Sequence, residues 1–125
     1  MNELEWSKWS KWQQMPNPAS YGKSLPRILK EMIPYFDQPG VYQLQNHKTG
    51  QYILFGESVE LAKRMGSLIP KEHGGVGRRN NFRKRDYVWE NLSDIHFRTL
   101  KCRSKAHAQM IENEIKQQYL YIFDT

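Results

Sequence analysis

The chain has 125 residues, a length that favours a single domain able to bury a modest core without disulfides or structural metal ions. Its 13% aromatic residues suffice for a packed interior, and no apolar run approaches the ~20 residues that a membrane-spanning helix needs. The formal net charge of +6 favours an anionic partner, of which nucleic acid is the commonest.

The N-terminal residues and the cysteine content bear on the cellular location. Residues 1–5 contain neither a basic start nor an apolar signal segment, so secretion is not expected. Cys102 is the only cysteine, which excludes an internal disulfide and fits a reducing compartment. We therefore expect a cytoplasmic protein with no membrane partner.

Residues 1–38 are expected to form a Trp-rich helical extension that packs on the rest of the domain. Tryptophan recurs at every third position from Trp6 to Trp12, a spacing that stays close to one helical face. These indoles are expected to cover the core, with a base-stacking platform as the alternative. A second helix is expected to begin near Ser24 and to end before Pro34.

Residues 39–125 show a pattern of short strands with helices between and after them. Three segments are typical of strands: 41–44, 52–55 and 95–102. The first two are joined by the turn-like segment 46–50, and helices are expected to begin at the N-cap residues Ser58 and Ser104. The order predicts an α/β or α+β fold, with a small three-stranded sheet flanked by helices.

Positive charge is concentrated from Lys71 to Arg85, a segment that contains six basic residues and one acidic residue. Gly74, Gly75 and Gly77 precede the arginines and indicate a mobile loop. A mobile basic loop suits a nucleic-acid backbone, and a merely solvated charged surface is the alternative. The candidate DNA contacts are Lys71, Arg78, Arg79, Arg83, Lys84 and Arg85.

Two charged residues lie at the borders of predicted buried helix faces. Arg64 is about 65° from the centre of the apolar stripe in the helix after Ser58. Glu112 is about 55° from the centre of the stripe in the last helix, whereas Glu114 is about 105° away on the other side. Arg64 could bind phosphate and Glu112 could hold a hard cation, although a snorkelling arginine and a solvated carboxylate are simpler readings.

In this order, the residues resemble the GIY-YIG nuclease domain over about positions 39–119. The resemblance rests on Gly40-Val41-Tyr42, Leu54-Phe55-Gly56-Glu57-Ser58, Leu61, Arg64, Ala108 and Glu112. The Trp-rich start is similar to the lead-in of some small prokaryotic and phage members. The resemblance implies a three-stranded antiparallel sheet and a DNA endonuclease that hydrolyses phosphodiester bonds with one divalent ion, Mg²⁺ or Mn²⁺.

By motif position, the resemblance also implies roles for individual side chains. Tyr42 corresponds to a tyrosine proposed to accept a proton from the attacking water, and Arg64 to the arginine that holds the scissile phosphate. Glu112 corresponds to the metal ligand. His73 lies in the loop where some members place a basic or imidazole side chain, and it is a further catalytic candidate. The oligomeric state stays open.

One position departs from the family pattern, because Leu54 stands where the family has its second tyrosine. Tyr52 lies two residues earlier and is expected on the same face of the strand, about 6.6 Å along it. Tyr52 is therefore a catalytic candidate as well, and a local bulge could shift it. The departure keeps two alternatives open: a catalytically impaired DNA-binding module on the same fold, and an interaction domain that uses its tryptophans on a protein partner.

Overall fold

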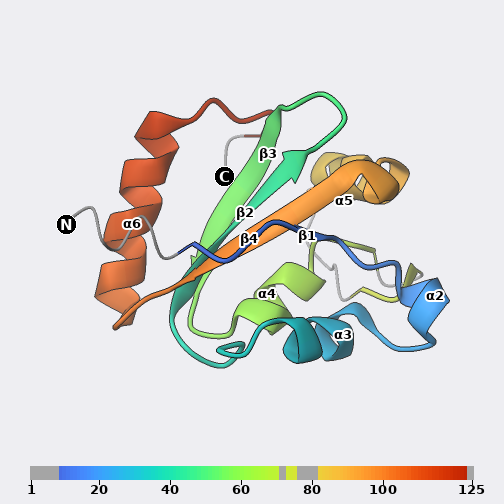
Figure 1. Ribbon diagram of the computed structural model, residues 1–125, viewed down its shortest axis with the longest axis horizontal. Helices are drawn as coiled ribbons and strands as arrows, with labels where there is room; N and C mark the ends of the chain where they lie inside the picture. The colour runs from blue at the N-terminus through green and yellow to red at the C-terminus, as the bar shows by residue number, and fades with distance from the viewer. Residues whose placement is uncertain (1–8, 71–72, 76–81, 124–125) are drawn as a thin grey trace.

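The computed structural model describes residues 9–70, 73–75 and 82–123, and this part of the chain forms an antiparallel sheet with five helices around it (Figure 1). The strands are β1 (Gln13–Gln14), β2 (Gly40–Asn46), β3 (Tyr52–Ser58) and β4 (Ile95–Lys101). The helices are α2 (Pro18–Tyr21), α3 (Leu25–Met32), α4 (Leu61–Gly66), α5 (Phe82–Glu90) and α6 (Lys105–Gln118), with a 3₁₀ turn, η2, at Leu92–Asp94. The predicted α+β class is confirmed.

The sheet has four strands in the order β1-β4-β2-β3, and every neighbouring pair is antiparallel. The three predicted strands are present, but the expected total of three is wrong because β1 adds a fourth. β1 comes from the N-terminal extension and pairs with the outer edge of β4. A free strand edge presents unpaired N–H and C=O groups, and β1 satisfies some of those on β4.

The N-terminal extension is extended where a helix was predicted. From Trp9 onward it follows β4, and the backbone N–H of Ser10 donates to the carbonyl of Thr99 at 2.9 Å. The predicted aromatic helix is therefore wrong for residues 9–12, while Trp6 lies outside the described residues. Pairing with a distant strand overrides the helical spacing of the tryptophans, since local propensity is a weak determinant beside tertiary contacts.

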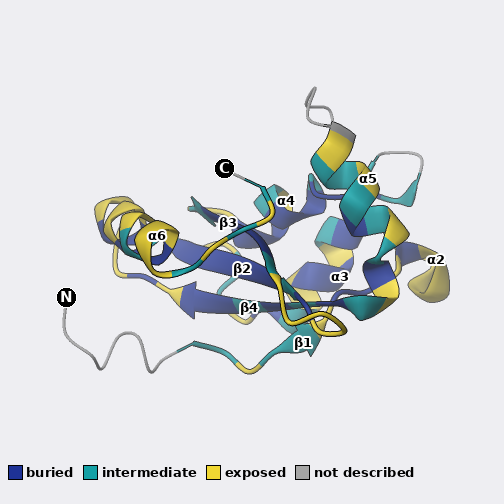
Figure 2. Cartoon of the chain, turned by 90° about the horizontal axis from the view of Figure 1, so that it is seen from above, coloured by how far each residue is buried: buried dark blue, intermediate teal, exposed yellow. Residues whose placement is uncertain are grey.

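Two apolar clusters lie on opposite faces of the sheet (Figure 2). The larger cluster packs under α3, α4 and α5 and includes Tyr42 and Leu54 from the sheet. The smaller cluster packs under α6 and includes Val41 and Phe55. Because both faces of the sheet are covered, residues 53–55 of β3 are all buried.

The pairing of β3 with β2 is interrupted by a β-bulge. Leu44 lies opposite Leu54, but the next residue of β2, Gln45, lies opposite Tyr52. Ile53 is therefore an extra residue on β3, and both Ile53 and Leu54 belong to the larger cluster. The extra residue reverses the alternation of side chains for the residues before it. Tyr52 therefore points to the face opposite that of Leu54.

The outer edge of β3 is covered by the C-terminal segment. The backbone N–H of Ile122 donates to the carbonyl of Tyr52 at 3.0 Å, and that of Phe123 donates to Ile53 at 3.0 Å. The sheet is thus protected at both edges by segments that flank the central region of the chain. Within the described residues, no helix combines the length and the apolar character needed to cross a lipid bilayer.

Part of the basic segment is helical rather than a loop. Residues 82–90 form α5, which carries Arg83, Lys84 and Arg85. Sequence periodicity missed this helix because, among residues 83–90, only Val88 is fully buried. An apolar stripe of a single residue gives almost no helical signal, and the packing of Val88 into the larger cluster instead anchors the helix.

The described glycines of the same segment lie between elements, as predicted, and are closely packed against neighbouring residues. A Cβ on Gly74 would lie 2.5 Å from the Cβ of Pro18, and one on Gly75 would lie 1.9 Å from the carbonyl oxygen of Ile69. Gly74 also has a positive φ of 93°. Glycine is present here because backbone and neighbour approach too closely for any side chain.

The two predicted N-caps have different outcomes. Ser104 is the N-cap of α6, and its Oγ accepts a hydrogen bond from the N–H of His107 at 3.1 Å, as predicted. Ser58 instead ends β3, and Glu60 is the N-cap of α4. The Oγ of Ser58 accepts from the N–H of Glu60 at 2.9 Å, so the serine stabilises the turn before the helix.

We expect Ser104→Ala to lower the free energy of unfolding by about 0.5–2 kcal/mol, because it leaves a helix N–H without its cap. Urea denaturation followed by circular dichroism measures this. Ser24→Ala is the matched control, since Ser24 is the N-cap of α3 but makes no side-chain cap bond. Equal destabilisation by the two substitutions would contradict the assigned role of Ser104.

Candidate active site

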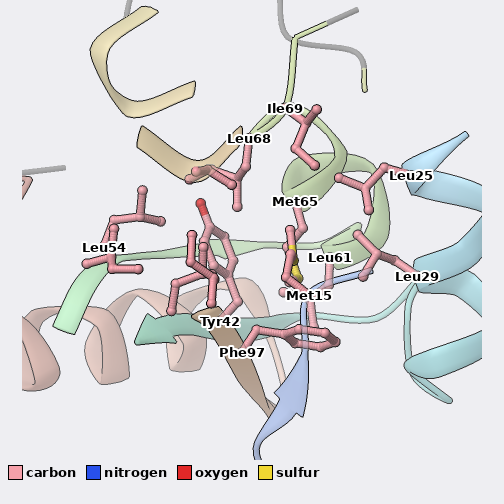
Figure 3. Packing of buried hydrophobic residues seen from close by; sticks show 14 of the residues in the cluster. Met15, Leu25, Leu29, Tyr42, Leu54, Leu61, Met65, Leu68, Ile69 and Phe97 are labelled. Atoms are coloured by element: carbon pink, nitrogen blue, oxygen red, sulfur yellow. The ribbon is translucent and has the colours of Figure 1, made fainter. Parts of the chain in front are cut away.

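Tyr42 and Gly56 form a close contact across neighbouring strands. They lie opposite each other in the β2–β3 pairing, and a Cβ on Gly56 would be 2.5 Å from the hydroxyl oxygen of Tyr42. The phenol therefore lies directly over the glycine, and only glycine leaves room for it. Figure 3 shows the ring among Leu54, Met65 and Leu68, and the Tyr42 side chain is only 3% exposed.

Arg64 lies on α4, on the same face of the sheet as Tyr42. The neighbouring residues Leu61 and Met65 are buried in the larger cluster, whereas Arg64 is half-buried. The predicted position at the border of the buried face is therefore confirmed. A half-buried arginine keeps its guanidinium accessible while its alkyl chain packs against the protein.

Glu112 lies on α6, on the other face of the sheet, and its carboxylate reaches the end of β3. The carboxylate accepts a hydrogen bond from the backbone N–H of Glu57. Burial raises the pKa of Glu112 above its usual value, and the nearby carboxylate of Glu57 adds to this effect. The Glu57 hydrogen bond and the positive charges of Arg64 and Lys116 act in the opposite direction.

These contacts bring side chains from both faces together at the end of β3. Gly56 carries the phenol of Tyr42 on one face, and the next residue, Glu57, binds Glu112 on the other. Arg64 is close enough to lower the pKa of Glu112 electrostatically. Tyr42 and Glu112 thus meet consecutive residues of one strand from opposite faces, and Arg64 lies within electrostatic range of Glu112.

Glu57 is a site residue that the sequence interpretation missed. It is half-buried, and its carboxylate lies near enough to Glu112 to raise the pKa of that residue. The alternation of β3 could have revealed it, because Glu57 comes two residues after Phe55, which faces α6.

The two carboxylates decide which metal ions this site could hold. Mg²⁺ and Mn²⁺ are commonly bound by one or two carboxylates together with water and phosphate oxygens, a donor set that Glu57 and Glu112 fit. The Glu57 carboxylate raises the pKa of Glu112, and a cation bound beside both groups would relieve this repulsion. In the described part of the chain, no three or more His, Cys, Asp or Glu residues are grouped as a zinc site would require.

Tyr52 does not lie beside Tyr42, although it was expected on the face that holds Leu54. Its ring is 4.5 Å from that of Tyr119 and 6.0 Å from that of Tyr121, on the α6 face of the sheet. The bulge at Ile53 is the physical reason, because it turns Tyr52 away from the Tyr42 face. The bulge therefore removes the second phenol from the site instead of restoring it.

Leu54 occupies the position next to Tyr42 instead. It is 1% exposed and packs in the same cluster as Tyr42 (Figure 3). On the Tyr42 face of the sheet, the place where a second tyrosine would stand is filled by an aliphatic side chain. Among the described residues, Tyr42 is therefore the phenol that remains at the candidate site.

His73 lies away from the end of β3. Its ring stacks on Trp89 of α5, with ring centroids 4.0 Å apart and planes 6° apart. Both residues line a pocket formed with α2 and the start of α3, and none of the described residues in its lining comes from β3, α4 or α6. The structure therefore does not bring His73 together with Arg64 and Glu112.

The candidate DNA contacts are only partly described. Lys71, Arg78 and Arg79 lie outside the described residues. Arg83, Lys84 and Arg85 lie on α5, which packs on the same face of the sheet as α4. Among these three, Arg83 is exposed and the other two are half-buried. The basic helix is thus on the face that also presents Arg64.

Comparison of the chain with protein-family models, with curated protein sequences and with solved structures found no match. The resemblance to the GIY-YIG domain therefore stays a prediction, carried by the residues of the sequence.

We expect Glu112→Gln to stabilise the fold slightly at neutral pH, by less than about 1 kcal/mol because partial exposure screens the charge. The raised pKa means that the folded state binds the proton more tightly than the unfolded state does. Protonated Glu112 makes its full contribution to the free energy of unfolding below the ordinary glutamate pKa. This contribution is lost as the pH rises through the raised pKa of the folded state.

Urea denaturation at pH 4 to 7 measures this, in steps of about one pH unit across the range in which glutamates titrate. Glu112→Gln should flatten the fall in stability with pH, because glutamine cannot ionise yet still offers an oxygen to the N–H of Glu57. Glu114→Gln is the matched control, since Glu114 is on the other side of α6. A larger loss of stability in Glu112→Gln than in the control would contradict the assigned environment.

Proposed function

We propose that the protein is a divalent-metal-dependent DNA endonuclease of the GIY-YIG kind. The observation that carries this proposal is that Arg64 and Glu112, from helices on opposite faces of the sheet, lie within electrostatic range of each other. A cation for a phosphate and a carboxylate for a metal ion are the two charged groups that phosphodiester hydrolysis needs most.

Each of these side chains would have its own role in the reaction. Arg64 donates hydrogen bonds to the scissile phosphate and stabilises the charge that develops on it. Tyr42 accepts a proton from the attacking water, the role that its motif position implies. Glu112, with Glu57 beside it, would hold the Mg²⁺ or Mn²⁺ ion, whose chemistry is to neutralise charge on the phosphate and the leaving oxygen.

The positions of α5 and α4 suggest how the DNA would lie. Arg83, Lys84 and Arg85 would contact the phosphate backbone without reading bases, and this contact would position the strand for Arg64. Such contacts make the affinity fall steeply with salt. Binding that barely changes between low and high salt would instead favour a domain that binds a protein partner.

A catalytically impaired DNA-binding module is the second candidate, and one observation favours it. Leu54 fills the place beside Tyr42, and Tyr42 itself is almost fully buried. With one enclosed phenol, proton transfer from water is slower than with two accessible ones. Metal-dependent cleavage separates this candidate from the nuclease.

We expect the protein to nick supercoiled plasmid in the presence of Mg²⁺ or Mn²⁺ and not in the presence of EDTA, as measured by agarose gel electrophoresis. Arg64→Ala should reduce the rate about 10²–10³-fold, the usual loss when a donor to developing charge is removed. Lys63→Ala is the matched control, since Lys63 is the adjacent, exposed cation on α4. No nicking by the unaltered protein, with DNA binding retained, would support the impaired module.

We expect Glu112→Ala to abolish nicking while leaving DNA affinity largely intact, because a metal ligand serves the reaction more than the binding. Glu57→Ala should give a partial loss that higher Mn²⁺ concentration relieves. Fluorescence anisotropy with labelled duplex and the nicking assay measure the two properties, with Glu114→Ala as the control. Equal loss of binding and cleavage in Glu112→Ala would argue against a metal-ligand role.

A further inference from the structure

A pocket of 630 Å³ opens between α2, the start of α3, α5 and residues 73–75. This volume lies in the range of small-molecule binding sites, about 300–1,000 Å³. The pocket is separate from the end of β3, since its described lining comes from other elements. Nothing in the proposed cleavage reaction uses it, although it contains His73, one of the residues singled out from the sequence.

One wall of the pocket is a preformed aromatic stack. The rings of His73 and Trp89 are 4.0 Å apart and within 6° of parallel. Trp89 is half-buried and packs against the larger apolar cluster, so its orientation is fixed by the core. A flat surface held in this way is suited to a planar aromatic ligand, and nucleic-acid bases stack on such side chains.

The pocket lining also contains cations. Lys23 and Arg27 line it, and its described lining includes no acidic residue. Lys23 is paired with Glu31 at 3.0 Å on the surface, whereas Arg27 is exposed and makes none of the ion pairs found within the described residues. A guanidinium at a pocket rim favours a phosphate, to which it can donate two hydrogen bonds.

Backbone contacts connect the segment that carries His73 to the part of the chain that carries Lys23 and Arg27. The N–H of Leu25, the first residue of α3, donates to the carbonyl of Gly74 at 2.8 Å. Gly74 in turn touches Pro18 so closely that no side chain would fit between them. The segment that carries His73 is thus fastened to α2 and to the start of α3, and the pocket is pre-organised for a ligand.

We propose that this pocket binds one unpaired nucleotide of single-stranded DNA, with the base extending the His73–Trp89 stack and the phosphate bound by Arg27. A duplex does not fit this chemistry, because its bases already stack on each other and are not available to side chains. The choice of DNA rests on the proposed function, whereas the pocket and its stack do not. The implied substrate class is DNA that exposes an unpaired strand next to the duplex to be cut.

Trp89 and the basic residues share one helix, which links the pocket to the candidate DNA contacts. Arg85 is one helical turn before Trp89, so the two lie on the same side of α5. If one base of a DNA strand enters the pocket, the neighbouring phosphates of that DNA strand would therefore pass Arg85 on α5. This gives the proposed DNA path a direction, from α5 toward the His73–Trp89 stack.

Fluorescence anisotropy in EDTA tests the proposal without cleavage. The probes are a labelled thymidine oligonucleotide, an abasic oligonucleotide of the same length and a duplex of that length. The thymidine strand should bind the unaltered protein roughly 5- to 100-fold more tightly than the abasic strand, the range expected from base–aromatic stacking. Trp89→Ala should remove most of this difference, and Arg27→Ala should weaken both single strands by a few-fold.

Lys105→Ala is the control, because it removes one exposed positive charge on α6, away from the pocket. It should leave the preference for the thymidine strand unchanged. Equal binding of the thymidine and abasic strands by the unaltered protein would overturn the proposal, even if Trp89→Ala failed to fold. A free nucleotide, thymidine monophosphate, that competes as well as the strand would also overturn it.

These results are independent of the proposed cleavage reaction. Binding in EDTA requires no metal ion, so a protein that nicks no plasmid can still show the preference for an unpaired base. Conversely, nicking of plasmid without such a preference would leave the nuclease proposal intact and remove only the role of the pocket.

Discussion

The hydrogen bond from the backbone N–H of Glu57 to the carboxylate of Glu112 is the contact on which the candidate site depends. It ties α6, which covers one face of the sheet, to the end of β3, beside which Tyr42 and Arg64 lie on the other face. Consecutive side chains of a β-strand point to opposite faces of the sheet. A strand covered on both faces can therefore contact the helices of both layers. The residues of the site are far apart in sequence for this reason.

The bulge in β3 controls what the site contains. In a regular strand, Tyr52 and Leu54 would share the Tyr42 face, and the missing second phenol could be supplied from two residues away. The extra residue Ile53 sends Tyr52 to the α6 face, where it packs with Tyr119. Bulges cannot be located from alternation alone, since an apolar run buried on both faces has no alternation to interrupt.

Features set by local interactions were predictable, and features set by distant partners were not. Ser104 was identified as a cap because its hydroxyl bonds the helix that immediately follows. The region from Trp9 to Trp12 has a helical spacing but is drawn into the sheet by β4, nearly ninety positions later. For the site, helix phase placed Arg64 correctly, whereas Glu57 required knowing that α6 packs on β3.

Not every positive charge of the protein is available to bind DNA, because Arg98 is already held by other side chains. The guanidinium of Arg98 lies between the rings of Trp9 and Trp12, at 4.4 and 4.6 Å, and its Nε donates to Gln43 at 2.7 Å. These indoles already face a cation, which weakens the case for a tryptophan surface that binds another protein. Among the described residues, the cations assigned to DNA belong instead to α3, α4 and α5, which cover the same face of the sheet. A bound strand would therefore run over that face, and the carboxylates of β3 and α6 would meet it only at the end of β3.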